Sequence, residues 1–424
     1  ADNTSRTKTY SMPLAGGSPR EIASTEGFLK DRNTSPDGKY RISARDVKLQ
    51  EVYGKDLYPD LPKSNVQVYD ALNYRHWDEW EDGAYSHLFV SSTRDGAGEG
   101  KDIMEGAPFD CPQKPFGGEE DYTWSPDSRF IVYVTKKKSG KAYALSTNTD
   151  LYSYEVATGK TTNLSQGMMG YDTHPLYSEQ GTLAWLSMQR DGYESDKNDI
   201  VVKLGNNIIN LTADWDGTVN AFVWSQDGKK IFFTAPVDGT IQLFEVEAQH
   251  VNKKHSIKQI TRGEFDVTGI AGQAVNELVV SRTDMNHAAE LYKVNLSDGS
   301  FTQLTHVNDD IYRKLSLSKV EKRYVRTTDG QQMLVWVIYP PGFDPSKKYP
   351  TLLYCQGGPQ SSLTQFYSFR WNFQLMAANG YVVVAPARRG MPGFGVAWNE
   401  QISKDWGGQV MEDYLTAIDE VSKE

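Results

Sequence analysis

Tyr349-Pro-Thr-Leu-Leu-Tyr-Cys-Gln-Gly-Gly-Pro359 is the stretch from which the organisation of the chain can be worked out. Its first part is a short, largely apolar run, which predicts a strand buried on both faces, and the run breaks at the two glycines. Tyr381-Val-Val-Val-Ala-Pro386 repeats this pattern. Between the two runs, residues 365–379 carry spaced apolar side chains and end on Asn379-Gly380, a typical helix stop. Strand, helix and strand in this order predict a parallel βαβ unit.

The region before this unit is repetitive. A polar turn of the type Ser-Pro-Asp-Gly recurs, and so does a short step in which an amide side chain is followed by Leu or Ile and then by Ser or Thr. The turns begin at Ser35, Ser125, Ser178 and Ser225, and the central residues of the steps are Leu164, Leu211, Ile260 and Leu304. Neighbouring steps are 47, 49 and 44 residues apart. A period of about 45 residues built from short strands and turns predicts the blades of a β-propeller.

One repeat is about twice as long as the others. The turns at Ser35 and Ser125 are 90 residues apart, and the extra residues fall between Arg41–Arg45 and His87–Val90. They include Tyr74-Arg-His-Trp-Asp-Glu-Trp80, which is rich in aromatic and acidic side chains. Because long insertions in compact domains are more often functional than idle, we expect a lid, a subunit contact or the wall of a cavity.

The pattern changes after Thr305. Residues 324–330 and 333–340 predict a hairpin around Asp329-Gly330, and residues 409–421 predict an amphipathic helix. We therefore place a domain boundary near residue 315, with a β-propeller domain at 1–315 and a second domain at 316–424 that contains the βαβ unit.

Composition and charge exclude several classes of protein. The formal net charge of −10 argues against a nucleic-acid partner and against binding to an anionic membrane surface. No apolar run approaches the roughly 18 residues of a membrane span. Cys111 and Cys355 are the two cysteines, and the predicted strand around Cys355 makes a disulfide between them improbable. We predict no metal site and no cofactor.

Three motifs in the second domain resemble the prolyl oligopeptidase family. These are Gln356-Gly-Gly-Pro359, Arg389-Gly390 with Gly393-Phe-Gly395, and Asp405-Trp-Gly-Gly408 with Glu412-Asp413-Tyr414. The resemblance is closest to the branch of dipeptidyl and acylaminoacyl peptidases. It implies an all-β propeller of seven or eight blades followed by an α/β-hydrolase domain. About six blades are visible here, so the resemblance implies that the propeller is incomplete at its N-terminus.

The nucleophile of such an enzyme is not found in this chain. The family's catalytic serine lies in a G-x-S-x-G turn after the next strand and is followed by Asp and then His. No G-x-S-x-G occurs in these residues. We therefore expect the hydrolase domain to be truncated before that turn. The remaining C-terminal part, with the Ser-Asp-His triad, would be required for activity.

Gly357 is the candidate catalytic group that the chain itself supplies. In hydrolases of this fold, the turn after the corresponding strand provides one backbone N–H of the oxyanion hole. A tight turn without catalytic function is the alternative. Many relatives carry Tyr or His where this chain has Gln356, so a side-chain contribution to the oxyanion hole is in doubt here. Arg388 and Arg389, next to a glycine-rich turn, are candidates for binding a peptide carbonyl group, with a structural bond to neighbouring loops as the alternative role.

A peptidase that removes dipeptides must hold a free α-ammonium group, which calls for carboxylates in a water-poor cavity. Glu119 and Glu120 lie in a predicted connection between blades, and Glu194 follows the predicted strand around Trp185. These three are the candidates. For each of them, a solvated loop acid is the alternative.

The resemblance implies a serine exopeptidase that releases dipeptides from the N-termini of short peptides, with the propeller gating access to the active site. An acylaminoacyl peptidase or an endo-oligopeptidase on the same scaffold is the nearest alternative. A propeller that only binds partners is disfavoured, because it would not carry a βαβ unit. We also expect a homodimer as a further partnership. For the compartment we expect the periplasm or the extracellular space, with the cytoplasm as the alternative.

Overall fold

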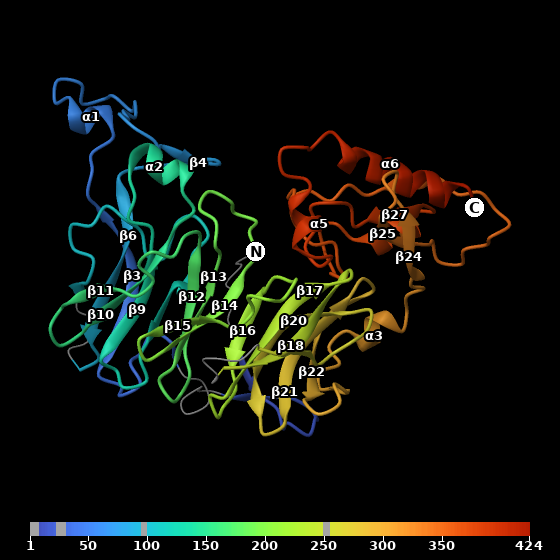
Figure 1. Cartoon of the computed structure of the whole chain (residues 1–424), viewed down its shortest axis with the longest axis horizontal. Helices are drawn as coiled ribbons and strands as arrows, with labels where there is room; N and C mark the ends of the chain where they lie inside the picture. Colours follow the sequence, from blue (N-terminus) through green and yellow to red (C-terminus); the bar gives the residue numbers. More distant parts are fainter. Residues whose placement is uncertain (1–7, 23–30, 95–99, 249–254) are drawn as a thin grey trace. The chain divides into compact units, whose positions relative to one another are not determined.

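A computed structural model describes residues 8–22, 31–94, 100–248 and 255–424 (Figure 1). The chain forms two compact units. One contains Glu26–Ala213 with Gln226–Gly228, and the other contains Ala1–Thr25, Asp214–Ser225 and Lys229–Glu424. We call them the N-terminal unit and the C-terminal unit. Parts of the predicted propeller, at residues 1–7, 23–30, 95–99 and 249–254, lie outside the described residues.

The N-terminal unit consists of small antiparallel sheets that follow one another along the chain. The first sheet contains β3 (Tyr40–Lys48), β6 (Ala84–Ser92) and β7 (Lys101–Asp102). The second contains β8 (Tyr122–Trp124), β9 (Phe130–Thr135), β10 (Asp150–Glu155) and β11 (Thr161–Asn163). The third contains β12 (Asp172–Tyr177), β13 (Leu183–Ser187), β14 (Asp199–Leu204) and β15 (Asn207–Asn210). Helix α2 (Gly140–Leu145) lies between β9 and β10.

These sheets pack against each other through alternate residues of their strands. Ile131 and Tyr133 of β9 share an apolar cluster with Leu88 of β6. Val132 and Val134, on the opposite face of β9, share a second cluster with strands β13 and β14 of the following sheet. Because successive side chains of a strand point to opposite faces, β9 contributes to two sheet-to-sheet cores.

The long insertion lies where the sequence predicted it. Strands β3 and β6 pair along their whole lengths, from Tyr40 opposite Ser92 to Lys48 opposite Ala84. The intervening residues 49–83 contain α1 (Gly54–Leu57), β4 (Arg75–His76) and β5 (Glu79–Trp80). The rings of Tyr69, Tyr74 and Trp80 contact one another there.

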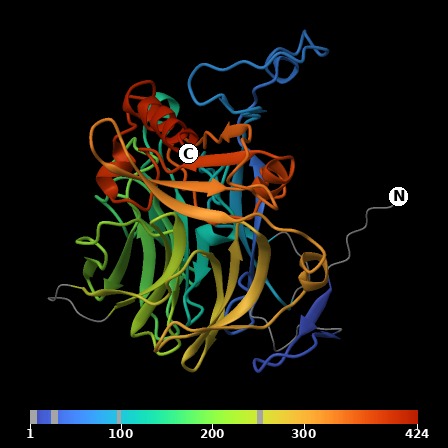
Figure 2. The same ribbon diagram turned by 90° about the vertical axis from the view of Figure 1, so that its right-hand side faces the viewer.

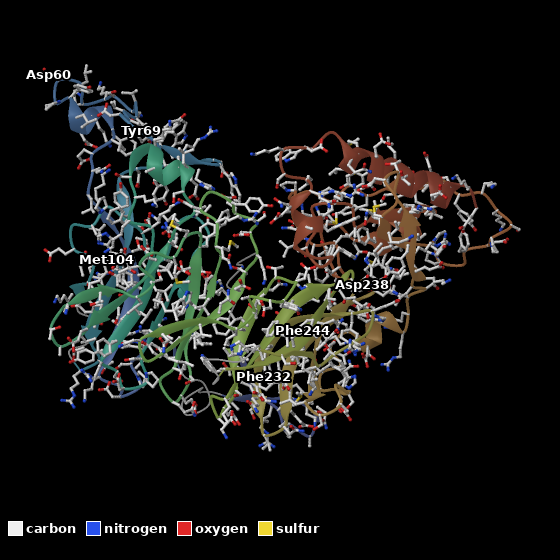
Figure 3. All side chains as sticks on the ribbon, viewed as in Figure 1. Asp60, Tyr69, Met104, Phe232, Asp238 and Phe244 are labelled. Atoms are coloured by element: carbon white, nitrogen blue, oxygen red, sulfur yellow. The ribbon has the colours of Figure 1, made fainter. Side chains whose placement is uncertain are left out.

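The C-terminal unit begins with further antiparallel strands. Strands β16 (Ala221–Trp224), β17 (Lys230–Val237), β18 (Thr240–Glu247) and β19 (Ile257–Gln259) pair in this order. Strands β20 (Asp266–Ala274), β21 (Glu277–Asp284), β22 (His287–Asn295) and β23 (Phe301–Gln303) do the same, and one parallel pairing of Ile241 with Asp266 joins the two sets. Figure 3 marks Phe232 and Phe244 on β17 and β18. A separate pair, β1 (Thr9–Ser11) with β2 (Arg20–Ile22), is also antiparallel.

Both sequence markers of the repeat have a structural basis. In the turns, the hydroxyl groups of Ser35, Ser125 and Ser225 each accept the backbone N–H five residues later, at 2.9–3.0 Å. In the steps, a Ser or Thr hydroxyl accepts the backbone N–H of the neighbouring strand. The four pairs are Leu151 with Ser165, Ile200 with Thr212, Leu243 with Thr261 and Leu291 with Thr305, at 2.8–3.0 Å. In each case the hydroxyl oxygen just after the last of four strands accepts a backbone N–H from the strand before it.

The last sheet is mixed and has the strand order β24-β25-β27-β26. The predicted hairpin is confirmed as β24 (Val320–Arg326) with β25 (Gln332–Ile338), and α3 (Asp309–Tyr312) precedes it. The predicted βαβ unit is confirmed by the parallel pairing of β26 (Thr351–Leu353) with β27 (Val382–Pro386) across α4 (Phe373–Ala378). Helices α5 (Val396–Glu400) and α6 (Gln409–Ser422) follow.

Helices cover both faces of this mixed sheet. Met333, Val335 and Val337 of β25 pack in one cluster with Ala417 of α6. Leu334, Trp336 and Ile338 point to the other face and pack with residues of α4. Figure 2 shows α6 in red across the orange strands. Among the described residues, no helix is both long and apolar enough to span a membrane.

Two details of the predicted βαβ unit were wrong. The first strand has only three residues, Leu352 on it is exposed, and Cys355 is exposed and free. The reason is that the chain leaves the sheet after Leu353, where β26 pairs with β27 alone. The helix begins at Phe373 rather than near residue 365, because the Asn372 side chain caps it by accepting the Leu375 N–H at 3.0 Å.

Candidate active site

The Gly357 turn follows β26 directly and is open. Gly357 is exposed, and a Cβ added there would meet no atom within 4 Å. Within the described part of the chain, no acceptor takes its N–H. The neighbouring Gln356 side chain is occupied, since its Oε1 accepts the Tyr354 hydroxyl at 2.9 Å. The group of this turn that is available to bind a substrate oxygen is therefore the Gly357 backbone N–H rather than the Gln356 side chain.

Arg388 and Tyr414 lie directly behind this turn. Arg388 follows β27, Tyr414 lies on α6, and their side chains are only 2% and 6% exposed. Arg388 Nη2 donates to the Gln356 carbonyl oxygen at 2.9 Å, and Arg388 Nε donates to the Tyr414 hydroxyl at 3.0 Å. The Tyr414 hydroxyl donates in turn to the Gln356 oxygen at 3.1 Å. Burial raises the pKa of Tyr414, so its hydroxyl keeps the proton that this bond needs.

Arg389, the predicted contact to a substrate carbonyl, is 3% exposed and lies in an ion-pair network. Its Nη2 lies 2.5 Å from Asp329 Oδ1, its Nε lies 3.7 Å from Asp413 Oδ2, and its backbone N–H donates to Asp413 at 3.1 Å. This network gives Arg389 a structural role. Its predicted contact with substrate stays a prediction. The sequence analysis missed Asp413 as its partner, although Glu412-Asp413-Tyr414 had been noted as a motif.

Three aspartates fix the loops around this site, one from β20 and two from the loops before β16 and between β17 and β18 of the same unit. Asp216 Oδ1 accepts the Val396 N–H at the start of α5, at 2.8 Å. The Asp238 N–H donates to the Gly393 carbonyl at 2.9 Å, and its carboxylate accepts the Tyr324 hydroxyl (Asp238 is labelled in Figure 3). Asp266 accepts the Thr364 hydroxyl at 2.6 Å, and burial raises its pKa to about 6. These bonds hold the C-terminal end of the glycine-rich loop, at Gly393 and Val396, and the segment after Gly357, at Thr364.

The predicted pair Glu119 and Glu120 lies in the N-terminal unit, on the short 3-10 helix η1 (Glu119–Asp121). The buried carboxylate of Asp121 anchors this turn by accepting the Gln113 N–H at 2.8 Å, and burial raises its pKa to about 6. Glu119 Oε1 accepts from the Asn33 side chain at 2.8 Å. Glu120 is half-buried, and no described residue forms a hydrogen bond or ion pair with its carboxylate.

The carboxylate of Glu120 lies close to Gly118. A Cβ at Gly118 would lie 2.8 Å from Glu120 Oε2, and the flexible end of the Glu120 side chain could shift to relieve that contact. The charge of Glu120 acts on two titratable groups, His174 of β12 and Asp121 of the same turn. Desolvation lowers the pKa of His174, and the negative charge of Glu120 acts in the opposite sense. Glu120 is therefore a carboxylate without a hydrogen-bond or ion-pair partner among the described residues, and it lies near the partly desolvated His174 of β12.

Glu194 lies at the exposed tip of the β13–β14 loop. Arg190 of this loop pairs with Asp196 at 2.5 Å and leaves Glu194 out of the ion pair. The charge of Glu194 acts on Lys136 and on Tyr171, the residue just before β12. Glu120 and Glu194 thus both lie near the start of β12, although no contact joins them.

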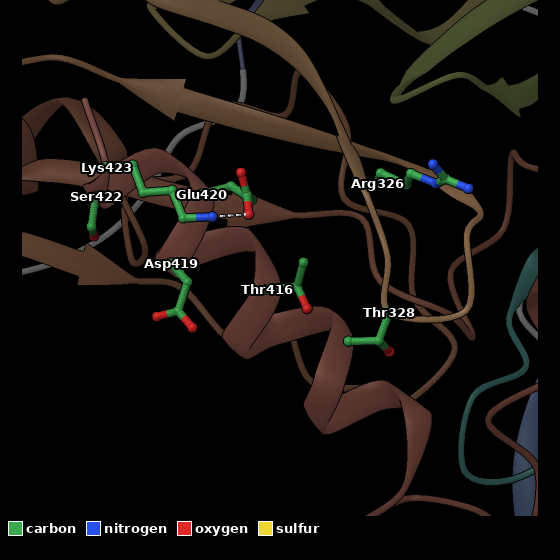
Figure 4. Close-up of a pocket in the computed structure, with 7 residues that line it drawn as sticks. All are labelled: Arg326, Thr328, Thr416, Asp419, Glu420, Ser422 and Lys423. Carbon is green, nitrogen blue, oxygen red and sulfur yellow. Dashed lines mark hydrogen bonds and ion pairs between the residues drawn. The ribbon is translucent and has the colours of Figure 1, made fainter.

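A surface pocket of about 570 Å³ lies on the C-terminal unit, between the β24–β25 hairpin and α6 (Figure 4). It contains none of the predicted site residues. Its lining residues are Arg326, Thr328, Thr416, Asp419, Glu420, Ser422 and Lys423.

Comparison with known proteins identifies the class of this chain. The profile of the Prolyl oligopeptidase family matches residues 367–424, and that of the Dipeptidyl peptidase IV N-terminal region matches residues 209–334. In these residues the chain is similar to the prolyl oligopeptidase family.

Particular members of the family are similar over nearly the whole chain. It is 46% identical to the dipeptidyl-peptidase 5 of Porphyromonas gingivalis over 404 residues, which cover 94% of this chain and 57% of that protein. The Porphyromonas endodontalis dipeptidyl-peptidase 5 is 45% identical over 96% of this chain and 59% of that protein. The solved acylaminoacyl peptidase of Pyrococcus horikoshii shares the fold, with a TM-score of 0.71 at 18% identity, over 96% of this chain and 58% of that one.

Proposed function

We propose that this chain supplies the substrate-binding acids and one oxyanion donor of a serine exopeptidase that releases dipeptides from the N-termini of short peptides. The observation that carries the proposal is the unpaired, half-buried carboxylate of Glu120 beside the anchored Glu119. The similarity to two proteins named dipeptidyl-peptidase 5 supports it. Since the chain spans 57–59% of these relatives, the activity concerns the full-length protein.

Glu120 suits the recognition of an α-ammonium group. A carboxylate that is partly withdrawn from water and lacks a cation attracts a positive charge more strongly than a solvated one. Glu119 is held by Asn33 and adds a second negative charge on the same turn. Glu194 is the weaker candidate, because it is exposed on a loop tip.

In the proposed reaction of the full-length protein, a serine attacks the scissile carbonyl carbon, and a histidine takes the serine proton. The carbonyl oxygen becomes an oxyanion and accepts the Gly357 N–H. Support for this part comes from the open Gly357 turn.

The finer architecture is part of the same proposal. We propose that the successive antiparallel sheets are blades of a seven- or eight-bladed propeller, about six of which lie here. The boundary with the α/β-hydrolase domain would lie near residue 315. A homodimer and a periplasmic or extracellular location remain predictions.

The test is to replace Glu120 by Gln in the full-length protein and to measure hydrolysis of dipeptidyl substrates with a free or an acylated N-terminus. Loss of a charged hydrogen bond costs about 1.5–3 kcal/mol, so KM for free substrates should rise roughly 10- to 100-fold. Glu119→Gln should have the same direction of effect, and Glu194→Gln a smaller one. Acylated substrates should show no such rise.

Glu105→Gln is the matched control, since Glu105 is an exposed acid of the same unit outside the proposed site. It should leave KM unchanged. If the wild-type protein prefers acylated substrates, the acylaminoacyl peptidase alternative is correct. If all three site variants hydrolyse both substrates normally, these acids do not bind the amine.

A further inference from the structure

The N–H of Gly357 belongs to the same peptide group as the carbonyl of Gln356. A peptide group is planar, and in the trans form its N–H and C=O point in opposite directions. The Gln356–Gly357 bond is trans, unlike Gly358–Pro359. Any group that fixes the Gln356 oxygen therefore fixes the direction of the Gly357 N–H.

Two buried donors hold this oxygen from behind. Arg388 Nη2 donates at 2.9 Å and the Tyr414 hydroxyl at 3.1 Å. The two donors are also bonded to each other, through Arg388 Nε and the Tyr414 oxygen at 3.0 Å. Three groups, from the segments that follow β26 and β27 and from α6, thus form a closed triangle of hydrogen bonds. This arrangement leaves the peptide little freedom to rotate.

The guanidinium of Arg388 is also unusual in its partners. It is 2% exposed, and within the described residues no carboxylate forms an ion pair with it. Its bonds go to neutral oxygens, those of Gln356, Tyr414 and Arg389. A buried cation without a counter-charge is costly for stability, so a functional reason for keeping it is expected.

The position of this charge suggests that reason. A hydrogen bond to a carbonyl oxygen polarises its peptide group and strengthens the N–H on the other side as a donor. A positive charge behind the peptide acts in the same direction, because it favours negative charge developing in front of the Gly357 N–H.

We propose that Arg388 and Tyr414 are positioning residues of the oxyanion hole. They clamp the Gln356 carbonyl, aim the Gly357 N–H into the open space of the turn, and increase its strength as a donor. Neither side chain touches the substrate in this arrangement. The inference rests on the proposed function, since it deepens the role of Gly357 in it.

The kinetic test uses Tyr414→Phe and Arg388→Lys in the full-length protein. Tyr414→Phe removes one donor to Gln356, and Arg388→Lys keeps the charge but loses the fork that bonds Gln356 and Tyr414 together. Because the oxyanion forms only in the transition state, kcat should fall roughly 10- to 100-fold while KM stays within about two-fold.

Tyr339→Phe is the matched control. Tyr339 is 7% exposed, directly follows β25, and its hydroxyl also accepts from an arginine, Arg323 Nη2 at 2.5 Å. It makes no contact with Gln356, so its loss should change kcat less than about two-fold. An equal fall in kcat for Tyr339→Phe and Tyr414→Phe would overturn the proposal, because the effect would then be structural.

A second measurement reads the peptide group directly and needs no activity. The 424 residues contain three Gln-Gly pairs, at Gln166-Gly167, Gln180-Gly181 and Gln356-Gly357. Labelling glutamine carbonyl carbon and glycine nitrogen gives an NMR signal for each pair, and Gly357→Ala identifies the third. In Tyr414→Phe and Arg388→Lys, the signal of Gln356-Gly357 should shift while the other two serve as unmoved internal references.

The kinetic and NMR measurements distinguish the positioning role of Arg388 and Tyr414 from the proposed function. An unmoved Gln356-Gly357 signal overturns the positioning role whatever the activity. A shifted signal with unchanged kcat shows that the peptide is clamped but that its N–H is not an oxyanion donor, which also overturns the proposal. Failure of the wild-type protein to cleave any dipeptidyl substrate overturns the proposed function alone, and the NMR result then still decides whether the clamp exists.

Discussion

Arg388 and Arg389 are adjacent in sequence and similarly buried, yet the regions around their guanidinium groups differ. Arg389 lies between two carboxylates, Asp329 and Asp413. Arg388 contacts only neutral oxygens, and one of them belongs to the peptide group of Gly357. We infer that the first region stabilises the fold, whereas the second is arranged around an open backbone donor. Two identical side chains can thus be assigned different roles from their partners alone.

The largest effect is expected for Arg389→Met. This change leaves Asp413, which is fully buried, without its cation, and removing one partner of a buried pair typically costs about 3–5 kcal/mol. Arg388→Met should cost less, about 1–3 kcal/mol, because it strands carbonyl oxygens but no carboxylate. Urea unfolding measures both. Adding Asp413→Leu to Arg389→Met should restore much of the stability, and equal losses for the two arginines would contradict the comparison.

Gly390→Ala should have the next largest effect, because it disturbs the junction of the two regions. Gly390 has φ +94°, and a Cβ there would lie 2.5 Å from Ile402 Cγ2 and 2.8 Å from Arg388 Nη1. Overpacking of this kind costs about 1–3 kcal/mol. Gly342→Ala is the control, since Gly342 has φ +69° with nothing within 4 Å, and it isolates the backbone strain. The difference between their unfolding midpoints measures the clash, and a difference of zero would rule it out.

A smaller effect with a defined pH dependence is expected for Asp329→Asn. The hydrogen bond from Arg389 and that from Thr327 lower the pKa of Asp329 to about 2. A lowered pKa contributes stability that is present above about pH 4 and is lost as the pH falls toward 2. Asp329 is partly exposed, so the contribution should stay under about 1 kcal/mol. Unfolding midpoints between pH 2 and 5 should vary less in Asp329→Asn than in the wild type.

Asp413 provides a second test of the pH dependence, because its pKa is raised whereas that of Asp329 is lowered. Burial raises the pKa of Asp413, so its contribution is greatest at low pH and falls as the pH rises through that raised value. Asp413→Asn should therefore remove a loss of stability on the alkaline side of pH 4. The same slope in both variants would show that Arg389 does not distinguish its two carboxylates.

The smallest effect on stability is expected for Gly357→Ala. No atom lies within 4 Å of the added Cβ, so the free energy of unfolding should change by less than about 0.5 kcal/mol. The methyl group would nevertheless stand beside the proposed oxyanion donor and should lower kcat roughly ten-fold. Gly407→Ala, at another exposed glycine with open space, should change neither quantity. Full activity of Gly357→Ala would argue against the oxyanion role.

The parts of the fold that depend on local pattern could be predicted from the sequence. The Ser-Pro-Asp-Gly turns and the Leu or Ile steps repeat because each sheet uses the same hydroxyl-to-backbone bonds, so their period is visible without a structure. The hairpin at Asp329-Gly330 and the parallel pairing of β26 with β27 follow from apolar runs and glycine stops in the same way.

The parts of the fold and of the candidate site that depend on contacts between distant residues could not be predicted from the sequence. Tyr414 appears in the sequence as part of the Glu412-Asp413-Tyr414 motif on a predicted helix, but its bond to Gln356 spans 58 residues and is not visible there. Asp216 caps α5 from 180 residues away. The late start of α4 and the exposure of Cys355 arise because the chain leaves the sheet early, which an apolar run does not reveal.

The hydroxyl bonds at the edges of the antiparallel sheets also bear on how the protein folds. The four bonds join residues only 12 to 18 positions apart, from Ile200 with Thr212 to Leu243 with Thr261. Contacts between residues close in sequence form early, because little chain entropy is lost when a short loop closes. We therefore expect the outer strand of each sheet to associate before neighbouring sheets meet. Each repeat would then enter the assembly as a nucleated unit, and the slow step would be the docking of sheets rather than the formation of strands.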